Sequence, residues 1–101
     1  MDAWADVLDE TAATHPGVSR RDVGPVTMYE VGGRLFAAAA GGKAEFLLKT
    51  DIARAALRTP RTESSPRGPD WVVFEPPEEP DQYDLDRLRS WFDMAARTAG
   101  G

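Results

Sequence analysis

A chain of 101 residues has the length of one small domain, and we treat residues 1–101 as a single unit. It contains no cysteine, which excludes disulfide bonds, a thiol nucleophile and thiolate metal sites. Hydrophobic residues make up 42% of the sequence and the net charge is -5, which indicates a folded protein rather than a disordered one.

The first predicted element is an amphipathic helix over residues 2–14. Asp2 is placed to cap its N-terminus, and five side chains share one face at helical spacing: Trp4, Val7, Leu8, Thr11 and Ala12. His15-Pro16-Gly17 ends the helix, because proline disfavours a helical conformation in the residue before it and glycine accepts the turn that follows.

Four short segments follow and are predicted as strands of an antiparallel meander: Val18–Asp22, Pro25–Val31, Arg34–Ala40 and Ala44–Lys49. Gly32-Gly33 and Gly41-Gly42 predict tight hairpin turns, because glycine tolerates the positive φ angles that two-residue turns require. The third segment alternates two sets of side chains, which we expect on opposite faces of the sheet: Phe36, Ala38 and Ala40 against Leu35, Ala37 and Ala39. The sequence leaves open whether the first segment pairs with the others.

The next part of the chain predicts a short helix, a loop and a strand. The helix covers Ile52–Arg58 and takes its cap from Thr50-Asp51. Residues 59–70 are rich in proline and poor in apolar side chains, which predicts a loop, and Trp71–Phe74 is the last strand.

A long helix is predicted at the end of the chain. It starts at Asp81 or Asp84, and its apolar face follows helical spacing through Leu85, Leu88 and Phe92. Together these elements predict the fold class: an α+β, two-layer protein with an antiparallel β-sheet on which the N- and C-terminal helices pack.

Four motifs occur in order along nearly the whole chain: His15–Val18, Val31–Ala37, Leu47–Asp51, and Trp71–Val73 before an acidic turn and the terminal helix. In these motifs the chain resembles the MmcQ/YjbR-like family. The resemblance implies an α-β(3)-α-β(2)-α fold, also seen in secretion chaperones, and a DNA-binding role with a double-wing arrangement in a family of uncharacterised biological role. The chain departs from the family's pattern at Val23, where members often carry an aromatic residue.

Basic residues concentrate in the middle of the chain. Residues 34–67 hold seven basic and three acidic side chains, whereas both flanking thirds are acidic. If the two hairpin tips act as wings, Arg34 and Lys43 flank them and contact DNA phosphates, and Lys49 and Arg67 extend the same surface. The plainer alternative is a solvated basic surface on a protein whose net charge repels DNA.

The sequence predicts no catalytic or metal-binding set. His15 is the only imidazole, and it is placed to interact with the dipole at the end of the first helix. The acidic residues between Glu75 and Asp86 lack the spacing of a calcium loop, and the glycine pairs match no nucleotide-binding fingerprint. We therefore expect a protein that is not an enzyme and that holds no metal or cofactor.

Two functions follow from this reading. The first is a DNA-binding module. The alternative is a protein-interaction or adaptor module with a secretion-chaperone-like fold, which pairs with itself or with another protein and does not bind nucleic acid. The longest apolar run, Leu35–Ala40, is too short to cross a membrane, and no secretory leader is visible, so we expect a cytoplasmic protein without a membrane partner.

Overall fold

The computed structural model describes residues 3–100 of the chain. Within this range the helices and strands follow in this order: α1 (Ala3–Ala12), β1 (Val18–Val23), β2 (Val26–Val31), β3 (Arg34–Ala40), β4 (Lys43–Leu47), α2 (Thr50–Ala56), β5 (Thr62–Ser64), β6 (Trp71–Phe74) and α3 (Gln82–Gly100). The predicted cap of the first helix, Asp2, lies outside the described residues.

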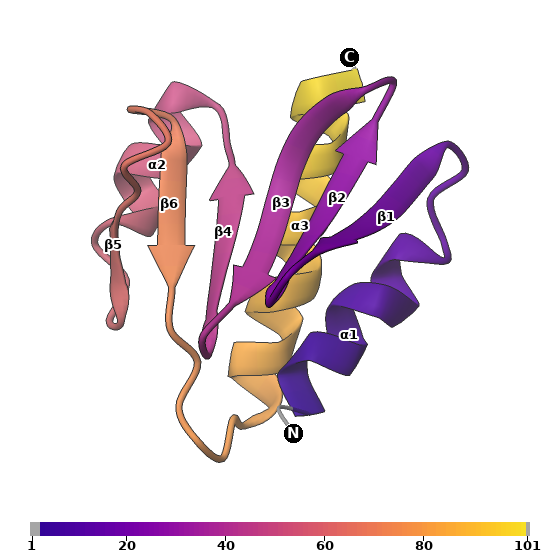
Figure 1. Cartoon of the computed structure of the whole chain (residues 1–101). Helices are drawn as coiled ribbons and strands as arrows, with labels where there is room; N and C mark the ends of the chain where they lie inside the picture. Colours follow the sequence, from indigo (N-terminus) through magenta and orange to yellow (C-terminus); the bar gives the residue numbers. More distant parts are fainter. Residues whose placement is uncertain (1–2, 101) are drawn as a thin grey trace.

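The strands form one antiparallel sheet in the order β1-β2-β3-β4-β6-β5 (Figure 1). Gly32 and Gly33 have φ angles of 59° and 79°, and Gly41 and Gly42 have 57° and 78°, which confirms the two predicted hairpin turns. β1 pairs with β2 along its whole length. Four strands therefore precede α2, one more than in the arrangement that the family resemblance implies.

β3 departs from the predicted alternation at a β-bulge. Tyr29 of β2 lies opposite Ala37, whereas the next residue, Glu30, lies opposite Leu35, so Phe36 has no partner across the ladder. Phe36 and Ala37 are both fully buried as a result. The alternation predicted for this strand is wrong here, because it assumes an uninterrupted ladder.

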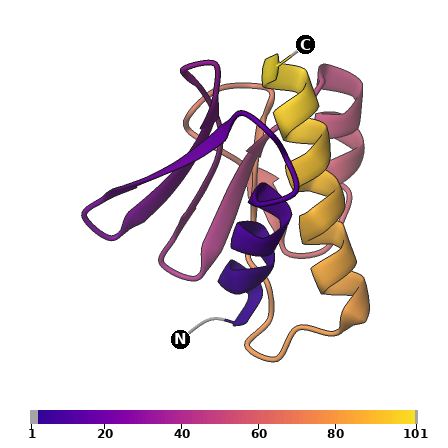
Figure 2. The ribbon, with the colours of Figure 1, turned by 90° about the vertical axis from the view of Figure 1, so that its right-hand side faces the viewer.

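All three helices lie on one side of the sheet, so the protein has two layers (Figure 2). α3 packs across the middle strands, and Phe92 on this helix lies 5.1 Å from both the Tyr29 and the Phe36 ring centroids in edge-to-face contacts. Trp91 packs in the same way against two phenylalanines of β4 and β6. The predicted fold class, an antiparallel sheet covered by the N- and C-terminal helices, is confirmed.

Two local predictions in the second half of the chain are wrong. α2 begins at Thr50 with Lys49 in the N-cap position, and no side chain caps it. The Thr50 hydroxyl donates instead to Asp70 Oδ1 at 3.0 Å, which ties the start of the helix to the loop before β6. The expected loop over residues 59–70 contains β5, which is held in place by its pairing with β6.

α3 begins directly after Asp81, one of the two starts that the sequence predicts, and Asp81 caps it. The Asp84 backbone N–H donates to Asp81 Oδ1 at 2.9 Å, and the Asp81 backbone N–H donates to Asp84 Oδ2 at 3.0 Å. This reciprocal capping box satisfies two of the backbone donors that every helix start leaves unpaired. The acidic connection before α3 thus has a structural role at its end.

Candidate functional site

The four cations predicted to contact DNA lie at both ends of the sheet. Arg34 is the first residue of β3, whereas Lys43 lies opposite Ala40, the last residue of that strand. A strand of seven residues spans about 20 Å, and consecutive hairpins of a meander always point to opposite ends. The two hairpin tips therefore do not lie side by side. Lys49 and Arg67 lie at the Arg34 end, where β4 ends and β6 begins (Figure 1).

Two of these four cations already have anionic partners. Arg67 Nε lies 2.6 Å from Glu45 Oε2, and its guanidinium stacks 5.5 Å from the centroid of Trp71. Lys43 Nζ lies 3.7 Å from Glu63 Oε1. Among the described residues, no ion pair involves Arg34 or Lys49. Phosphate binding gains most from cations that have no protein partner, so this placement weakens the case for a DNA surface.

The helices leave the other face of the sheet uncovered, and we call it the open face; it is turned towards the viewer in Figure 1. Tyr29 and Phe46 face the helices, so Met28 and Glu45, their neighbours along the strands, face the other way. An apolar patch lies on the β1–β3 half of the open face: Val23, Val26, Met28, Leu35 and Ala38. Val23 is 50% exposed, and Val26, Met28 and Leu35 are half-buried.

Ion pairs surround this patch. Arg21 Nη2 lies 3.4 Å from Glu30 Oε2 and 3.9 Å from Met28 Sδ, so it crosses from β1 to β2 beside the patch. The Lys43–Glu63 and Arg67–Glu45 pairs lie on the β4–β6 half. Arg21, Lys43 and Arg67 each have an anionic partner on this face, so these pairs add no net charge to it, although the whole chain carries a charge of -5.

The β4–β6 half of the open face is closed by its own side chains. Ser65 is 7% exposed; its hydroxyl donates to Glu45 Oε2 at 3.0 Å and accepts the Arg67 backbone N–H at 3.1 Å. Leu47 and Val73 on this half are buried beside their larger cross-strand partners, Trp71 and Glu45. Trp71 is half-buried, and the Arg67 guanidinium lies over its ring. Val23, Val26, Met28 and Leu35 therefore form the larger group of accessible apolar side chains on the open face, and they lie on its β1–β3 half.

A polar cluster on the other side of the sheet holds α1 in place. The Tyr29 hydroxyl donates to Asp9 Oδ1 at 2.6 Å, and Arg20 Nη1 donates to Asp9 Oδ2 at 2.6 Å. Burial raises the pKa of Tyr29 far above its ordinary value, and the hydrogen bond to Asp9 raises it further. Just after the C-terminal end of α1, His15 Nε2 lies 3.0 Å from Asp93 Oδ1, so the imidazole links this turn to α3.

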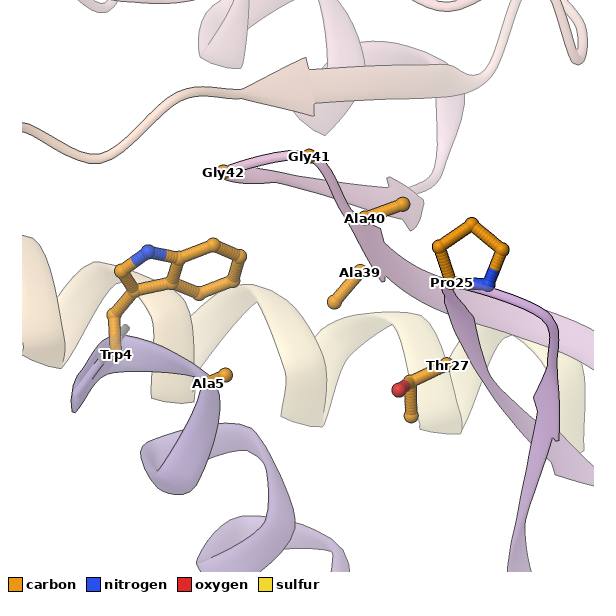
Figure 3. Close-up of a pocket in the computed structure, with 8 residues that line it drawn as sticks. All are labelled: Trp4, Ala5, Pro25, Thr27, Ala39, Ala40, Gly41 and Gly42. Atoms are coloured by element: carbon orange, nitrogen blue, oxygen red, sulfur yellow. The ribbon is translucent and has the colours of Figure 1, made fainter. Parts of the chain in front are cut away.

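A small hollow of about 190 Å³ opens between the start of α1 and the turns at the same end of the sheet (Figure 3). Trp4 and Ala5 form one wall, and Pro25, Thr27 and the segment 39–42 form the other. The only side-chain hydroxyl there, on Thr27, donates to Asp22 at 3.0 Å. The residues that line the hollow include no charged side chain, and its one hydroxyl already has a hydrogen-bond partner.

Within residues 3–100, no three His, Asp or Glu side chains gather closely enough to hold a metal ion. In the same range, none of the helices combines the length and apolar character needed to cross a bilayer. Comparison of the chain with protein-family models, curated proteins and solved structures found no match. Membership of the MmcQ/YjbR-like family therefore stays a prediction.

Proposed function

We propose that this chain is a non-enzymatic protein-interaction module that pairs with a second copy of itself through the open face. The observation that supports this proposal is the patch of Val23, Val26, Met28, Leu35 and Ala38, which no helix covers. Antiparallel sheets that keep one face in water usually place polar residues there. An apolar patch in that position indicates an association surface.

Charge favours a second copy as the occupant. Two molecules that each carry -5 repel one another over most of their surfaces. On the open face Arg21, Lys43 and Arg67 are each paired within the chain, so two such faces approach without net repulsion. A symmetric pair also buries the same patch on both partners, which doubles the apolar area removed from water.

DNA is the competing occupant, because the family resemblance implies it. Arg34 and Lys49 are the predicted cations without an ion pair among the described residues, and they lie at one end of the sheet rather than across a face. The acidic residues from Glu75 to Asp86 add to a net charge that repels the duplex. We therefore rank self-association above DNA binding.

Sedimentation velocity over about 2–500 µM tests the proposal. The patch has one exposed, three half-buried and one buried side chain, which is smaller than a standard interface, so we expect a dimer with a dissociation constant on the order of 10–100 µM. Met28→Asp places a charge in the centre of the patch and should leave a folded monomer, since the half-buried position allows the new carboxylate to stay hydrated. Tyr83→Asp is the matched control, because Tyr83 is 80% exposed on α3.

Circular dichroism shows whether both variants fold. A wild-type protein that stays monomeric at 500 µM, or a folded Met28→Asp variant that dimerises like wild type, would overturn the proposal. Fluorescence anisotropy with a labelled 20-base-pair duplex tests the competing function, DNA binding. A monomer that binds the duplex with a steep salt dependence, lost when Arg34 and Lys49 are both changed to Gln, would replace self-association by DNA binding.

A further inference from the structure

A second candidate site lies on the helix layer, away from the open face. A cleft of about 210 Å³ opens between the first turn of α2 and the last turns of α3, and its walls are Lys49, Ile52, Met94, Arg97 and Thr98. Figure 1 shows α2 and the last turns of α3 at the same end of the sheet, with β4 between them in that view. None of the cleft residues belongs to the apolar patch of the open face, so the cleft is separate from the proposed self-association surface.

The floor of the cleft is apolar. Ile52 is half-buried, and Met94 is 37% exposed, although its neighbours on the inner face of α3 are buried in the core. Methionine side chains adapt their shape to apolar ligands, because they have several rotatable bonds and a polarisable sulfur. The Thr98 hydroxyl donates to the Met94 backbone carbonyl at 2.8 Å, so its proton is already used. A ligand therefore meets an apolar floor below and cations at the rim.

The cations favour a ligand with one negative charge. Arg97 Nη2 lies 3.0 Å from Asp93 Oδ2, which offsets its charge, but the side chain is 77% exposed and its other N–H donors have no described partner. Lys49 forms no ion pair among residues 3–100, not even with the nearby Asp51. One cation is thus left uncompensated, which matches a carboxylate better than a doubly charged phosphate.

The size of the cleft limits the apolar part of the ligand. A volume of 210 Å³ is that of about seven water molecules in the liquid. A chain or branched group of roughly five to eight carbon atoms fills such a space. With one apolar contact surface and one charged group, a ligand of this size binds with a dissociation constant on the order of 1 mM.

We infer that the cleft between α2 and α3 binds an aliphatic carboxylate, with the carboxylate between Lys49 and Arg97 and the apolar group over Ile52 and Met94. This chemistry occurs in a free medium-chain acid and in the C-terminal leucine of a peptide. The carboxylate accepts hydrogen bonds from the ammonium and the guanidinium, and the aliphatic group covers the part of Met94 that water now reaches.

Methyl NMR of protein labelled at the methionine methyl groups tests this directly, because the chain has only three methionines. Met94 reports on the cleft and Met28 on the open face, and Met28→Leu and Met94→Leu assign the two signals. Octanoate is titrated to about 20 mM into dilute protein. We expect a saturable shift of the Met94 signal with an unmoved Met28 signal.

Controls separate the two parts of the ligand. Octanol has the same chain without the charge and should shift Met94 at least fivefold more weakly. Acetyl-Gly-Leu with a free carboxylate, compared with its amide, distinguishes a peptide C-terminus from a free acid as the better ligand. Lys49→Gln should weaken octanoate binding about fivefold to tenfold. Arg54→Gln, at an exposed position on α2, removes the same charge and should leave binding unchanged.

A Met94 signal that does not move with octanoate would overturn the inference. Equal binding of octanol and octanoate, or unchanged binding by Lys49→Gln, would also overturn it, because the cleft would then be an apolar depression without a carboxylate site. These outcomes are independent of self-association, which the Met28 signal and sedimentation report separately.

Discussion

The hydrogen bond from Tyr29 to Asp9 is one of two polar links between α1 and the sheet, the other being Arg20–Asp9, and Tyr29→Phe removes it without changing the shape of the core. The Tyr29 ring is 2% exposed and keeps its contact with Phe92 in the variant. Hydrogen bonds to charged groups contribute about 1.5–3 kcal/mol to stability. The Asp9 side chain is 39% exposed, so water can replace the lost Tyr29 hydroxyl as a donor to Asp9 Oδ1. Asp9 Oδ2 also keeps its ion pair with Arg20 Nη1 at 2.6 Å. We therefore expect a loss of about 1.5 kcal/mol, at the lower end of that range.

Urea unfolding followed by tryptophan fluorescence measures this loss. In a domain of about 100 residues, 1.5 kcal/mol lowers Tm by roughly 6–10 °C. Tyr83→Phe is the control, because its exposed ring carries no described side-chain hydrogen bond and should change stability by less than about 0.5 kcal/mol. If both variants unfold at the wild-type urea concentration, the Asp9 link does not stabilise α1 and the reasoning is refuted.

The same hydroxyl predicts a dependence on alkaline pH. The folded state raises the pKa of Tyr29, so the folded protein holds this proton more tightly than the unfolded chain does. The resulting stabilisation is complete below the unfolded value of about 10 and is lost as pH rises above it. Wild type should therefore lose stability above pH 10 more steeply than Tyr29→Phe; equal slopes would contradict the assignment.

Three further changes test the packing and the turns by thermal unfolding. Phe92→Ala empties the centre of the aromatic cluster and should cost about 3–5 kcal/mol, enough to leave much of a small domain unfolded; a loss below 1 kcal/mol would contradict the core described above. Gly42→Ala should cost about 1–2 kcal/mol because φ is 78°, whereas Gly100→Ala, within the helix, should be nearly neutral; equal effects would contradict the turn geometry. Asp81→Ala removes the capping box of α3 and should cost about 1 kcal/mol, and an unchanged Tm would show that the cap is not formed in solution.

Much of the fold follows from local signals in the sequence. Paired glycines fix both hairpins, because two adjacent residues with positive φ have few alternatives to a tight turn. The helical spacing of Leu88 and Phe92 also predicts how α3 packs. Only one face of this helix is apolar, so that face must lie on the sheet. The bulge at Phe36 has no such signal: it depends on which residue of β2 lies opposite, and the sequence of β3 does not specify this. β5 is also set by pairing, as its three residues carry little strand preference of their own.

The candidate sites depend even more on tertiary structure. Arg67 reads as a free cation in the sequence, but β4 brings Glu45 to 2.6 Å from it across 22 residues. The meander itself places Arg34 and Lys43 at opposite ends, and strand order alone would have indicated this. The place of Met28 on the open face has a local signal, because Met28 is next to the buried Tyr29 in β2 and neighbouring residues of a strand face opposite sides of the sheet. The cleft at Met94 joins residues about 45 positions apart, and no local pattern predicts it.

The position of the Met28 methyl signal on dilution tests the central proposal most directly. Between about 1 mM and 10 µM the proposed pairing should move this signal along the same curve that sedimentation gives for the dimer, while the Met94 signal stays in place. A Met28 signal that does not change over this range would contradict the proposed use of the open face, even if the protein forms a dimer through another surface.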